Sequence, residues 1–225
     1  MRILQGWMNL LFPPKCIFCR KILTGGGNLC CQDCMEKLEN QEYVSEGMFG
    51  RPCWTALYYE GAVRDAVARF KFRGSRGYAM EFGEILGRCI QRHLTGEYDL
   101  ITWVPVSEKR CRQRGYDQAM LLAQATALYL GDVAVETLKK PVDNPTQSSL
   151  RSVAERKSNV LGAYCAAEPE LTAGKRILLI DDVITTGATM EEASRTLLDA
   201  GAKTVLGAAL ARPREYTKDS CEVSL

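Results

Sequence analysis

The sequence predicts an α/β protein whose mostly parallel sheet is flanked by helices and preceded by a small cysteine-rich module. Apolar stretches typical of strands alternate with amphipathic stretches typical of helices through most of the chain. Over residues 175–213 a strand, a helix and a strand follow in close order, which requires a parallel crossover. Two pairs of cysteines stand near the N-terminus. We therefore expect residues 1–50 to form an N-terminal arm and the module, and residues 51–225 to form the α/β domain.

The composition is that of an ordinary globular protein, because 46% of the 225 residues are hydrophobic, 25% are charged and the net charge is +2. So small a charge gives no general attraction to nucleic acid or to a membrane surface. No apolar run approaches the roughly 20 residues of a membrane-spanning helix, so we expect no membrane insertion. The weakly amphipathic residues 1–16 indicate a docking helix or arm, with a signal peptide as the alternative, and we expect a cytoplasmic protein.

Four cysteines of the N-terminal module have the spacing of zinc ligands. Cys16 and Cys19 form one CxxC pair, and Cys31 and Cys34 form a second pair after eleven intervening residues. Two such knuckles can converge as thiolate ligands of one Zn²⁺, and four sulfurs leave no open position, so the metal would be structural. Cys30 is left out because its spacing to Cys34 suits a knuckle less well. Free buried thiols are the alternative interpretation.

The α/β domain is expected to begin with a strand and two helices. Residues 53–61 alternate as a strand does, and Gly61 ends this strand. Apolar residues then recur with a helical period over 62–72 and again over 77–94. The basic, glycine-bearing segment 71–77 between the two helices suits either a solvated turn or a contact with phosphate.

The remaining elements follow in the order of an α/β fold. A buried type of strand is predicted over 98–106, and a helix over 116–131. The polar segment 141–160 has no apolar period and is typical of a mobile loop. The last three elements are expected at 175–183 (strand), 188–201 (helix, closed by Gly201) and 203–213 (strand).

Two adjacent acids mark a candidate site at the end of the 175–183 strand. In open parallel sheets, ligands bind beyond the carboxyl ends of the strands, and Asp181 and Asp182 stand at such an end. Ionised carboxylates next to an apolar strand are costly to bury without a partner, and the loop that follows contains no basic residue. We therefore expect both acids to face a solvent-lined cleft.

The segment after the acids has the features of a phosphate site. Thr185, Thr186 and Gly187 lead into a helix whose first N–H groups lack partners and whose dipole is positive at this end. The segment is neither a Walker A loop nor a G-x-G-x-x-G loop. Acids that accept from sugar hydroxyls beside a phosphate cradle predict a site for a ribose 5-phosphate. The alternative is simple capping, in which Thr186 caps the helix and the acids shape a turn.

These residues also carry a resemblance to a known family. The stretch ILLIDDVITTGAT (177–189) resembles the phosphoribosyl diphosphate (PRPP) signature of the type I phosphoribosyltransferases. The stretches 70–74, 104–123 and 147–164, together with the two CxxC pairs, resemble the ComF family of competence-associated, phosphoribosyltransferase-like proteins of bacteria. The implied fold is a type I phosphoribosyltransferase-like sheet preceded by a small zinc ribbon.

The resemblance implies a role for each matching residue. Asp181 and Asp182 would bind the ribose hydroxyls of PRPP, directly or through Mg²⁺. The residues that would hold its 5-phosphate are Thr185, Thr186, Gly187, Ala188 and Thr189. The residues that would surround its pyrophosphate are Pro105, Val106, Ser107, Arg110 and Arg114. Segment 141–160 corresponds to the lid, from which Arg156 would contact the substrate on closure, and Arg156 and the two acids are the expected catalytic residues. The family usually has Asn where this chain has Asp117, an acid that is free to pair with the arginines and weaken their hold on pyrophosphate.

The implied function is PRPP binding, with Mg²⁺-dependent transfer of the phosphoribosyl group to an unknown acceptor and release of pyrophosphate. A regulator that binds PRPP without transferring it is one alternative. Another is a DNA-uptake or DNA-processing accessory that binds single-stranded DNA or a helicase partner through the zinc module, residues 110–114 and residues 71–77. The only histidine, His93, is expected to lie inert on a helix surface.

Overall fold

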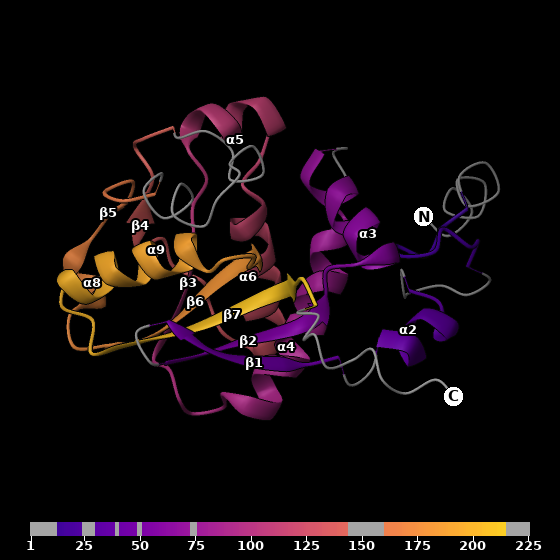
Figure 1. The fold of residues 1–225 in the computed structure, drawn as a ribbon, viewed down its shortest axis with the longest axis horizontal. Coiled ribbons are helices and arrows are strands. Elements are labelled where there is room, and N and C mark those ends of the chain that lie inside the picture. Colours follow the sequence, from indigo (N-terminus) through magenta and orange to yellow (C-terminus); the bar gives the residue numbers. More distant parts are fainter. Residues whose placement is uncertain are drawn as a thin grey trace, which may run out of the picture.

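The computed structural model describes residues 13–23, 30–38, 41–48, 51–72, 76–143 and 160–214. Within these residues, the main sheet has five strands in the order β1-β2-β7-β6-β3 (Figure 1). Strands β2, β7, β6 and β3 are parallel, and β1 is antiparallel to β2, which confirms the mostly parallel sheet. The strands are β1 (Tyr43–Met48), β2 (Arg51–Tyr58), β3 (Leu100–Trp103), β6 (Arg176–Val183) and β7 (Thr204–Arg212).

The predicted helices are present with small changes at their ends. They are α3 (Gly61–Phe72), α4 (Tyr78–His93), α6 (Gln118–Leu130) and α9 (Ala188–Asp199). Shorter elements that were not predicted are α2 (Gln32–Leu38), α5 (Glu108–Arg114), α8 (Pro169–Thr172), β4 (Leu138–Lys139) and β5 (Cys165–Ala166). The antiparallel pair β4 and β5 flanks residues 144–159, so most of the expected lid, Arg156 included, lies outside the described residues. Among the described residues, no helix is long and apolar enough to cross a membrane.

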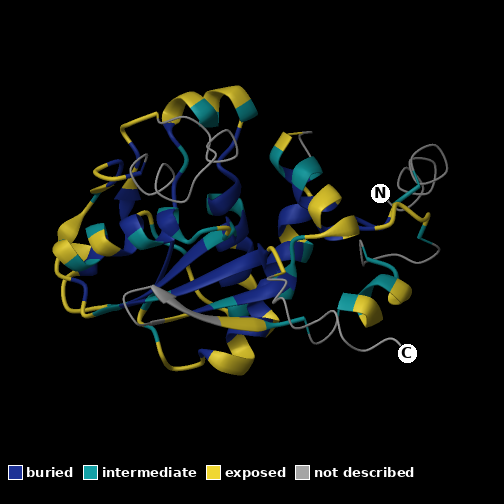
Figure 2. Ribbon diagram, in the orientation of Figure 1, coloured by how far each residue is buried: buried dark blue, intermediate teal, exposed yellow. Residues whose placement is uncertain are grey.

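Helices cover both faces of the sheet, and β6 is buried between them (Figure 2). Leu178 and Ile180 pack in the core cluster that includes α4 and α6, whereas Ile177 and Leu179 pack in the cluster that includes α9. This alternation follows from the two-residue period of a strand. A strand buried on both faces explains the continuous apolar run before Asp181.

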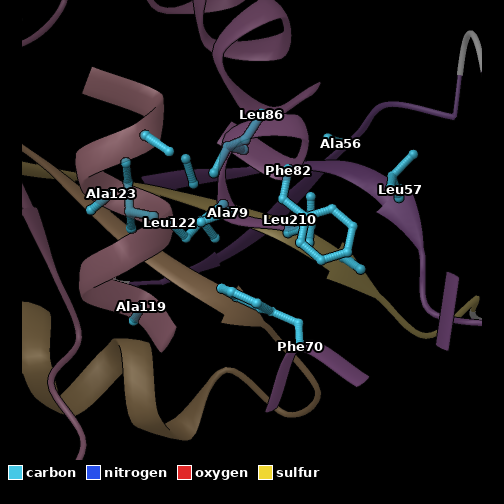
Figure 3. Close-up of a cluster of buried hydrophobic side chains, with 14 of the residues drawn as sticks. Ala56, Leu57, Phe70, Ala79, Phe82, Leu86, Ala119, Leu122, Ala123 and Leu210 are labelled. Carbon is cyan, nitrogen blue, oxygen red and sulfur yellow. The ribbon is translucent and has the colours of Figure 1, made fainter. Parts of the chain in front are cut away.

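Helices α4 and α6 approach each other closely through two glycines of α4. A Cβ atom at Gly83 would lie 2.5 Å from Cβ of Ala125, and one at Gly87 would lie 2.4 Å from Cδ1 of Tyr129. Real Cβ atoms do not come this close, so glycine is required at Gly83 for the backbones to meet. Aromatic side chains of α3 and α4 fill the space beside this contact, with the rings of Phe70 and Phe82 5.4 Å apart (Figure 3).

The cysteine-rich module shares the core of the α/β domain. Ile17 and Phe18, which lie between the cysteines of the first knuckle, are buried, and the Phe18 ring is 6.1 Å from the ring of Phe82 on α4. The Arg69 guanidinium on α3 donates to the carbonyl oxygens of Ile17 (2.5 Å) and Phe18 (3.3 Å). The first knuckle is therefore anchored to α3 and α4 by both apolar packing and hydrogen bonds.

Candidate functional site

Two acids lie at the carboxyl end of β6. Asp182 is buried, and its Oδ1 atom is 2.7 Å from Nζ of Lys71 on α3. Asp181 accepts a hydrogen bond from the backbone N–H of Asp182 at 2.7 Å. The expectation that both acids face a solvent-lined cleft is wrong for Asp182, because a lysine from a distant part of the chain compensates its burial. Lys71 belongs to the basic segment 71–77, for which the sequence allowed either a solvated turn or a contact with phosphate.

The two carboxyl groups differ in their electrostatic surroundings. Burial, followed by repulsion from the charge of Asp182, raises the pKa of Asp181 to about 8. The ammonium group of Lys71 acts in the opposite direction. The ion pair opposes the charges of Asp182 and Lys71, and the raised pKa of Asp181 favours its protonated form.

The turn from β6 into α9 holds a buried hydroxyl that lacks a hydrogen-bond partner among the described residues. Gly187 is the N-cap, with a φ of +76°, and it makes no side-chain capping bond. The first backbone bond within α9 runs from Glu191 N to Gly187 O at 2.8 Å, so the helix itself does not satisfy the N–H groups of residues 188–190. The hydroxyl oxygen of Thr186 is buried and has no hydrogen-bond partner among the described residues. Thr186 therefore does not cap the helix, and the capping alternative is wrong.

A small hollow lies against these donors. It has a volume of about 10 Å³, and the residues that line it are Asp181, Val183, Ile184, Thr185, Gly187, Thr189 and Met190. A buried hydroxyl without a partner is unfavourable unless a ligand or water completes its hydrogen bonds. The chemistry of this turn is thus that of an anion site, with acids on its β6 side and N–H donors on its α9 side.

The segment that follows β3 runs beside the acids. Trp103 is paired with Ile180 in the sheet, and Val104 N donates to Ile180 O at 2.9 Å. Residues 105–107 therefore leave the sheet next to Asp181. The sheet brings together the two groups of residues that the sequence assigned to ribose 5-phosphate and to pyrophosphate, because β3 and β6 are neighbours.

Asp117 holds this segment in place. It is the N-cap of α6, where its Oδ1 accepts from Met120 N at 3.1 Å, and its Oδ2 accepts from Val106 N at 2.9 Å. Burial raises the pKa of Asp117, and the two backbone bonds oppose the shift. The sequence suggested that Asp117 pairs with neighbouring arginines, but both of its oxygens bind backbone N–H groups. Its role in the structure is to join the start of α6 to the segment after β3.

Arg110 lies among groups from two other elements. Ser107 is the N-cap of α5, accepting from Arg110 N at 3.4 Å, and its hydroxyl donates to Asp143 Oδ1 at 2.5 Å. The other oxygen of Asp143 is 3.1 Å from Nζ of Lys109, and Oδ1 is 3.7 Å from Nε of Arg110. Lys109 therefore pairs with an acid that lies beyond β4.

Arg114, one helical turn later, is half-buried. Its Nη1 donates to Gln118 Oε1 at 2.6 Å, and its guanidinium lies 4.9 Å from the centre of the Phe72 ring. Burial lowers the pKa of Arg114, and the charge of Asp182 opposes this shift. Arg112 instead lies exposed and pairs with Glu108 on its own helix at 3.2 Å, as expected of a solvated residue.

A buried lysine near the site was missed by sequence reasoning. Lys140, directly after β4, is 8% exposed, and its Nζ donates to the hydroxyl of Tyr164 at 3.2 Å. Burial, followed by repulsion from Arg110, lowers the pKa of Lys140 to about 8, while the charges of Asp181 and Asp143 favour its protonated form. No sequence signal marked this residue, because it stood at the edge of a polar segment without a motif.

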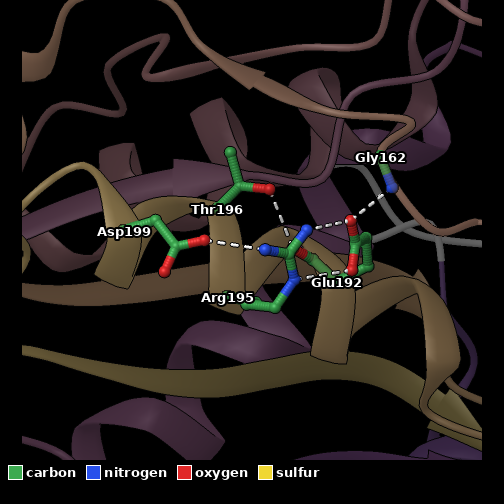
Figure 4. Close-up of polar contacts among 5 residues, drawn as sticks. All are labelled: Gly162, Glu192, Arg195, Thr196 and Asp199. Carbon is green, nitrogen blue, oxygen red and sulfur yellow. Dashed lines mark hydrogen bonds and ion pairs between the residues drawn. The ribbon is translucent and has the colours of Figure 1, made fainter.

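The chain after the expected lid is fixed to α9. The backbone N–H of Gly162 donates to Oε1 of Glu192 at 2.6 Å (Figure 4). Glu192 is 4% exposed and also accepts from the guanidinium of Arg195 at 2.6 and 3.0 Å. These bonds hold the segment that begins at residue 160 against the helix that carries the predicted phosphate turn.

The four predicted zinc ligands converge. Atoms Sγ of Cys16, Cys19, Cys31 and Cys34 lie within 4.8 Å of one another, and those of Cys19 and Cys31 are 3.6 Å apart. Sulfurs at the corners of a zinc tetrahedron are separated by about 3.8 Å. The set therefore fits a structural Zn²⁺. Cys30 is not one of the four cysteines whose Sγ atoms lie within 4.8 Å of one another, and its own Sγ donates to the carbonyl oxygen of Cys31 at 3.5 Å.

His93 takes part in a second cluster, against the expectation that it is inert. It stacks on Trp54 with ring centroids 4.1 Å apart, and its Nε2 lies 2.7 Å from Oε2 of Glu42. Arg92 binds the other oxygen of Glu42. Cys89 completes a group of possible metal ligands with Glu42 and His93. The Glu42 carboxylate already binds two side chains of α4. These contacts anchor α4 to the chain before β1, which explains the cluster without a metal.

Comparison with known proteins places the chain in a family. It is 31% identical over 182 residues to the competence protein ComFC of Streptococcus pneumoniae, covering 81% of this chain and 74% of the relative. The chain belongs to the ComF family. Other members of the ComF family are ComFC of Bacillus subtilis, 26% identical over 85% of this chain and 82% of the relative, and competence protein F of Haemophilus influenzae, 26% identical over 91% and 100%.

The two parts of this ComF-family chain match separate domain families. Residues 116–224 match the phosphoribosyl transferase domain, and residues 7–52 match the double zinc ribbon domain. Among solved structures, an adenine phosphoribosyltransferase is 15% identical, covers 84% of this chain and 94% of its own, and has a TM-score of 0.41. A PRPP amidotransferase from B. subtilis is 19% identical, covers 63% and 30%, and also has a TM-score of 0.41.

Proposed function

We propose that this ComF-family chain binds PRPP with Mg²⁺ beyond the carboxyl ends of β3 and β6. It then transfers the phosphoribosyl group to an acceptor and releases pyrophosphate. The observation that carries the proposal is the turn before α9, where the hydroxyl of Thr186 is buried without a partner beside two acids. A 5-phosphate would accept a hydrogen bond from that hydroxyl and would lie at the positive end of the α9 dipole. The described residues contain no disulfide, which supports the proposal that the protein acts in the cytoplasm.

The residues of this site would divide the work of the transfer. Asp181 and Asp182 offer carboxylate oxygens to the ribose hydroxyls and to Mg²⁺, which when bound would neutralise charge on the pyrophosphate. Ser107, Arg110 and Arg114 would stabilise the negative charge that grows on pyrophosphate as its bond to C1 breaks. Arg156, outside the described residues, would add a contact as the lid excludes water.

Thr186→Val tests the proposal with little risk to the fold. The change removes a hydroxyl that has no partner and keeps the shape of the side chain, so stability should be unchanged or slightly higher. A hydrogen bond to a charged phosphate contributes roughly 1.5–3 kcal/mol, so PRPP should bind about 10- to 100-fold more weakly in calorimetry with Mg²⁺. The matched control is Thr95→Val, on the exposed loop after α4, which should leave the affinity unchanged.

Loss of the acids gives the second arm of this test. The double variant Asp181→Asn with Asp182→Asn should bind PRPP too weakly to measure, while circular dichroism checks that it is folded. Equal heats for wild type, Thr186→Val and the double variant would refute PRPP binding at this site. A role as a DNA-uptake or DNA-processing accessory would then be the better proposal, which the name of a Salmonella typhi relative, DNA utilization protein YhgH, supports (36% identity over 48% of this chain and 46% of the relative).

A further inference from the structure

The carboxylate of Asp143 lies where the proposed function needs pyrophosphate. It accepts from the hydroxyl of Ser107 at 2.5 Å and pairs with Lys109 at 3.1 Å and with Arg110 at 3.7 Å. Ser107 and Arg110 are the residues to which the proposal gives the pyrophosphate. An acid of the chain itself therefore already accepts the hydrogen bond of Ser107 and forms an ion pair with Arg110.

These contacts leave little capacity for a second anion. Ser107 is 1% exposed, and its hydroxyl has one proton, which it donates to Asp143. The hydrogen bond from Ser107, then the pairing with Lys109, lowers the pKa of Asp143, so the carboxylate is ionised at neutral pH. A ligand phosphate can bind Ser107 only if the carboxylate of Asp143 moves away.

Asp143 nevertheless lies near more than one cation. Lys109 and Arg110 contribute two charges, and Lys140 lies close enough to both Arg110 and Asp143 for their charges to act on it. One carboxylate supplies a single negative charge, whereas pyrophosphate supplies two or more. Displacement of Asp143 by pyrophosphate is therefore electrostatically favourable, but it has to break three existing contacts.

We propose that Asp143 determines the specificity of this site: its carboxylate stands in for pyrophosphate, so a ribose 5-phosphate ester without pyrophosphate binds directly, whereas PRPP binds only by displacing Asp143. This inference rests on the proposed function. The 5-phosphate is unaffected because its donors belong to the turn between β6 and α9, while Asp143 follows β4. Asp143 thus lowers the affinity for the pyrophosphate end alone.

The test compares three ligands on wild type and Asp143→Asn, in calorimetry with Mg²⁺: PRPP, ribose 5-phosphate and inorganic pyrophosphate. Asn keeps the size of the side chain but removes the charge that competes. Asp143→Asn should bind PRPP and pyrophosphate at least tenfold more tightly and ribose 5-phosphate with unchanged affinity. Asp65→Asn, an exposed acid on α3, is the control for the same change in net charge and should leave all three affinities unchanged.

Each other outcome has a separate meaning. If wild type binds PRPP but Asp143→Asn binds pyrophosphate equally or more weakly, the inference is wrong and the proposed function stands. An equal gain for ribose 5-phosphate would also overturn the inference, because the effect would then be one of general charge. If neither protein binds PRPP or pyrophosphate, the proposed function fails and takes this inference with it.

Discussion

Asp182 and Lys71 show how an acid pair is tolerated at the end of a buried strand. Their side chains are 12% and 19% exposed, and the ion pair compensates the burial of the Asp182 carboxylate. Asp181 is accommodated differently, since its raised pKa lets it bind a proton near neutral pH. A ligand with hydroxyl groups or a cation would therefore meet one paired carboxylate and one that can lose its proton.

Lys140 leads to a prediction about pH and stability. Its pKa is about 8 in the folded protein and 10.5 in the unfolded chain, so between these values the unfolded chain binds the additional proton. Unfolding free energy then rises with pH across this window, by up to roughly 3 kcal/mol. In Lys140→Met this rise should be absent. The difference in unfolding free energy between wild type and variant, measured by urea unfolding, should therefore change between pH 7.5 and pH 10.

The neighbouring residue provides the control for that measurement. Lys139 is exposed, so Lys139→Met should keep the pH dependence of wild type. Parallel curves for wild type and Lys140→Met from pH 7.5 to pH 10 would contradict a lowered pKa for Lys140.

At the scale of elements, the contact between α4 and α6 depends on Gly83 more than on Gly87. Alanine at Gly83 would meet the backbone of α6, with Ala125 C at 2.6 Å and Thr126 N at 2.8 Å. We expect Gly83→Ala to lower the unfolding free energy by about 2–3 kcal/mol despite the roughly 1 kcal/mol gain in helix propensity. Denaturant unfolding measures this change.

Gly87→Ala is the matched comparison on the same helix. The three nearest atoms to its new Cβ all belong to the ring of Tyr129, a side chain that is 41% exposed and has room to shift toward solvent. The change in unfolding free energy should stay within about 1 kcal/mol. Equal losses for the two variants would show that the backbone of α6 moves away without much cost.

Sequence patterns predicted the long elements and failed for the short ones. The apolar periods of α3 and α4 were readable because each of these helices buries one face over three or more turns. In contrast, α5 has no buried residue, and its signals were its caps, Ser107 and Gly115. Strands β4 and β5 are two residues each, which is too short for a period.

The candidate site shows the same division between local and long-range information. Asp181, Thr186 and Gly187 are contiguous in sequence, so their shared motif was visible. Lys71 and Asp143 reach the site from other elements, and only the folded chain reveals which residues they meet. A single sequence was enough to name the two groups of proposed substrate contacts, but not the side chains of the protein that pair with them.

Over the whole molecule, the zinc module and the α/β domain are joined by a common core. From the sequence, we expected residues 1–50 and 51–225 to form separate units, and the boundary at residue 50 stays a prediction. Ile17 and Phe18 are buried against α3 and α4, so the order of the knuckle contributes to the stability of the domain. Because of this packing, we expect the stability of the sheet to depend on zinc.

Removal of zinc should therefore affect the whole chain. In calorimetry, a strong chelator should lower the midpoint of the main unfolding transition by roughly 5 °C or more, because loss of the knuckle exposes Ile17 and Phe18. Cys19→Ser should do the same, while Cys165→Ser, at an exposed cysteine outside the cluster, should not. An unchanged main transition after removal of zinc would show that the knuckle adds nothing to the domain.

The pairing of β3 with β6 also gives the protein an intrinsic optical probe. Trp103 is the last residue of β3, is 7% exposed, and directly precedes the segment assigned to pyrophosphate. Of the other two tryptophans, Trp54 stacks on His93 beside α4 and Trp7 lies outside the described residues. With phenylalanine at those two positions, the remaining indole emission would come from the edge of the candidate site, and ligand binding could be followed there without an attached dye.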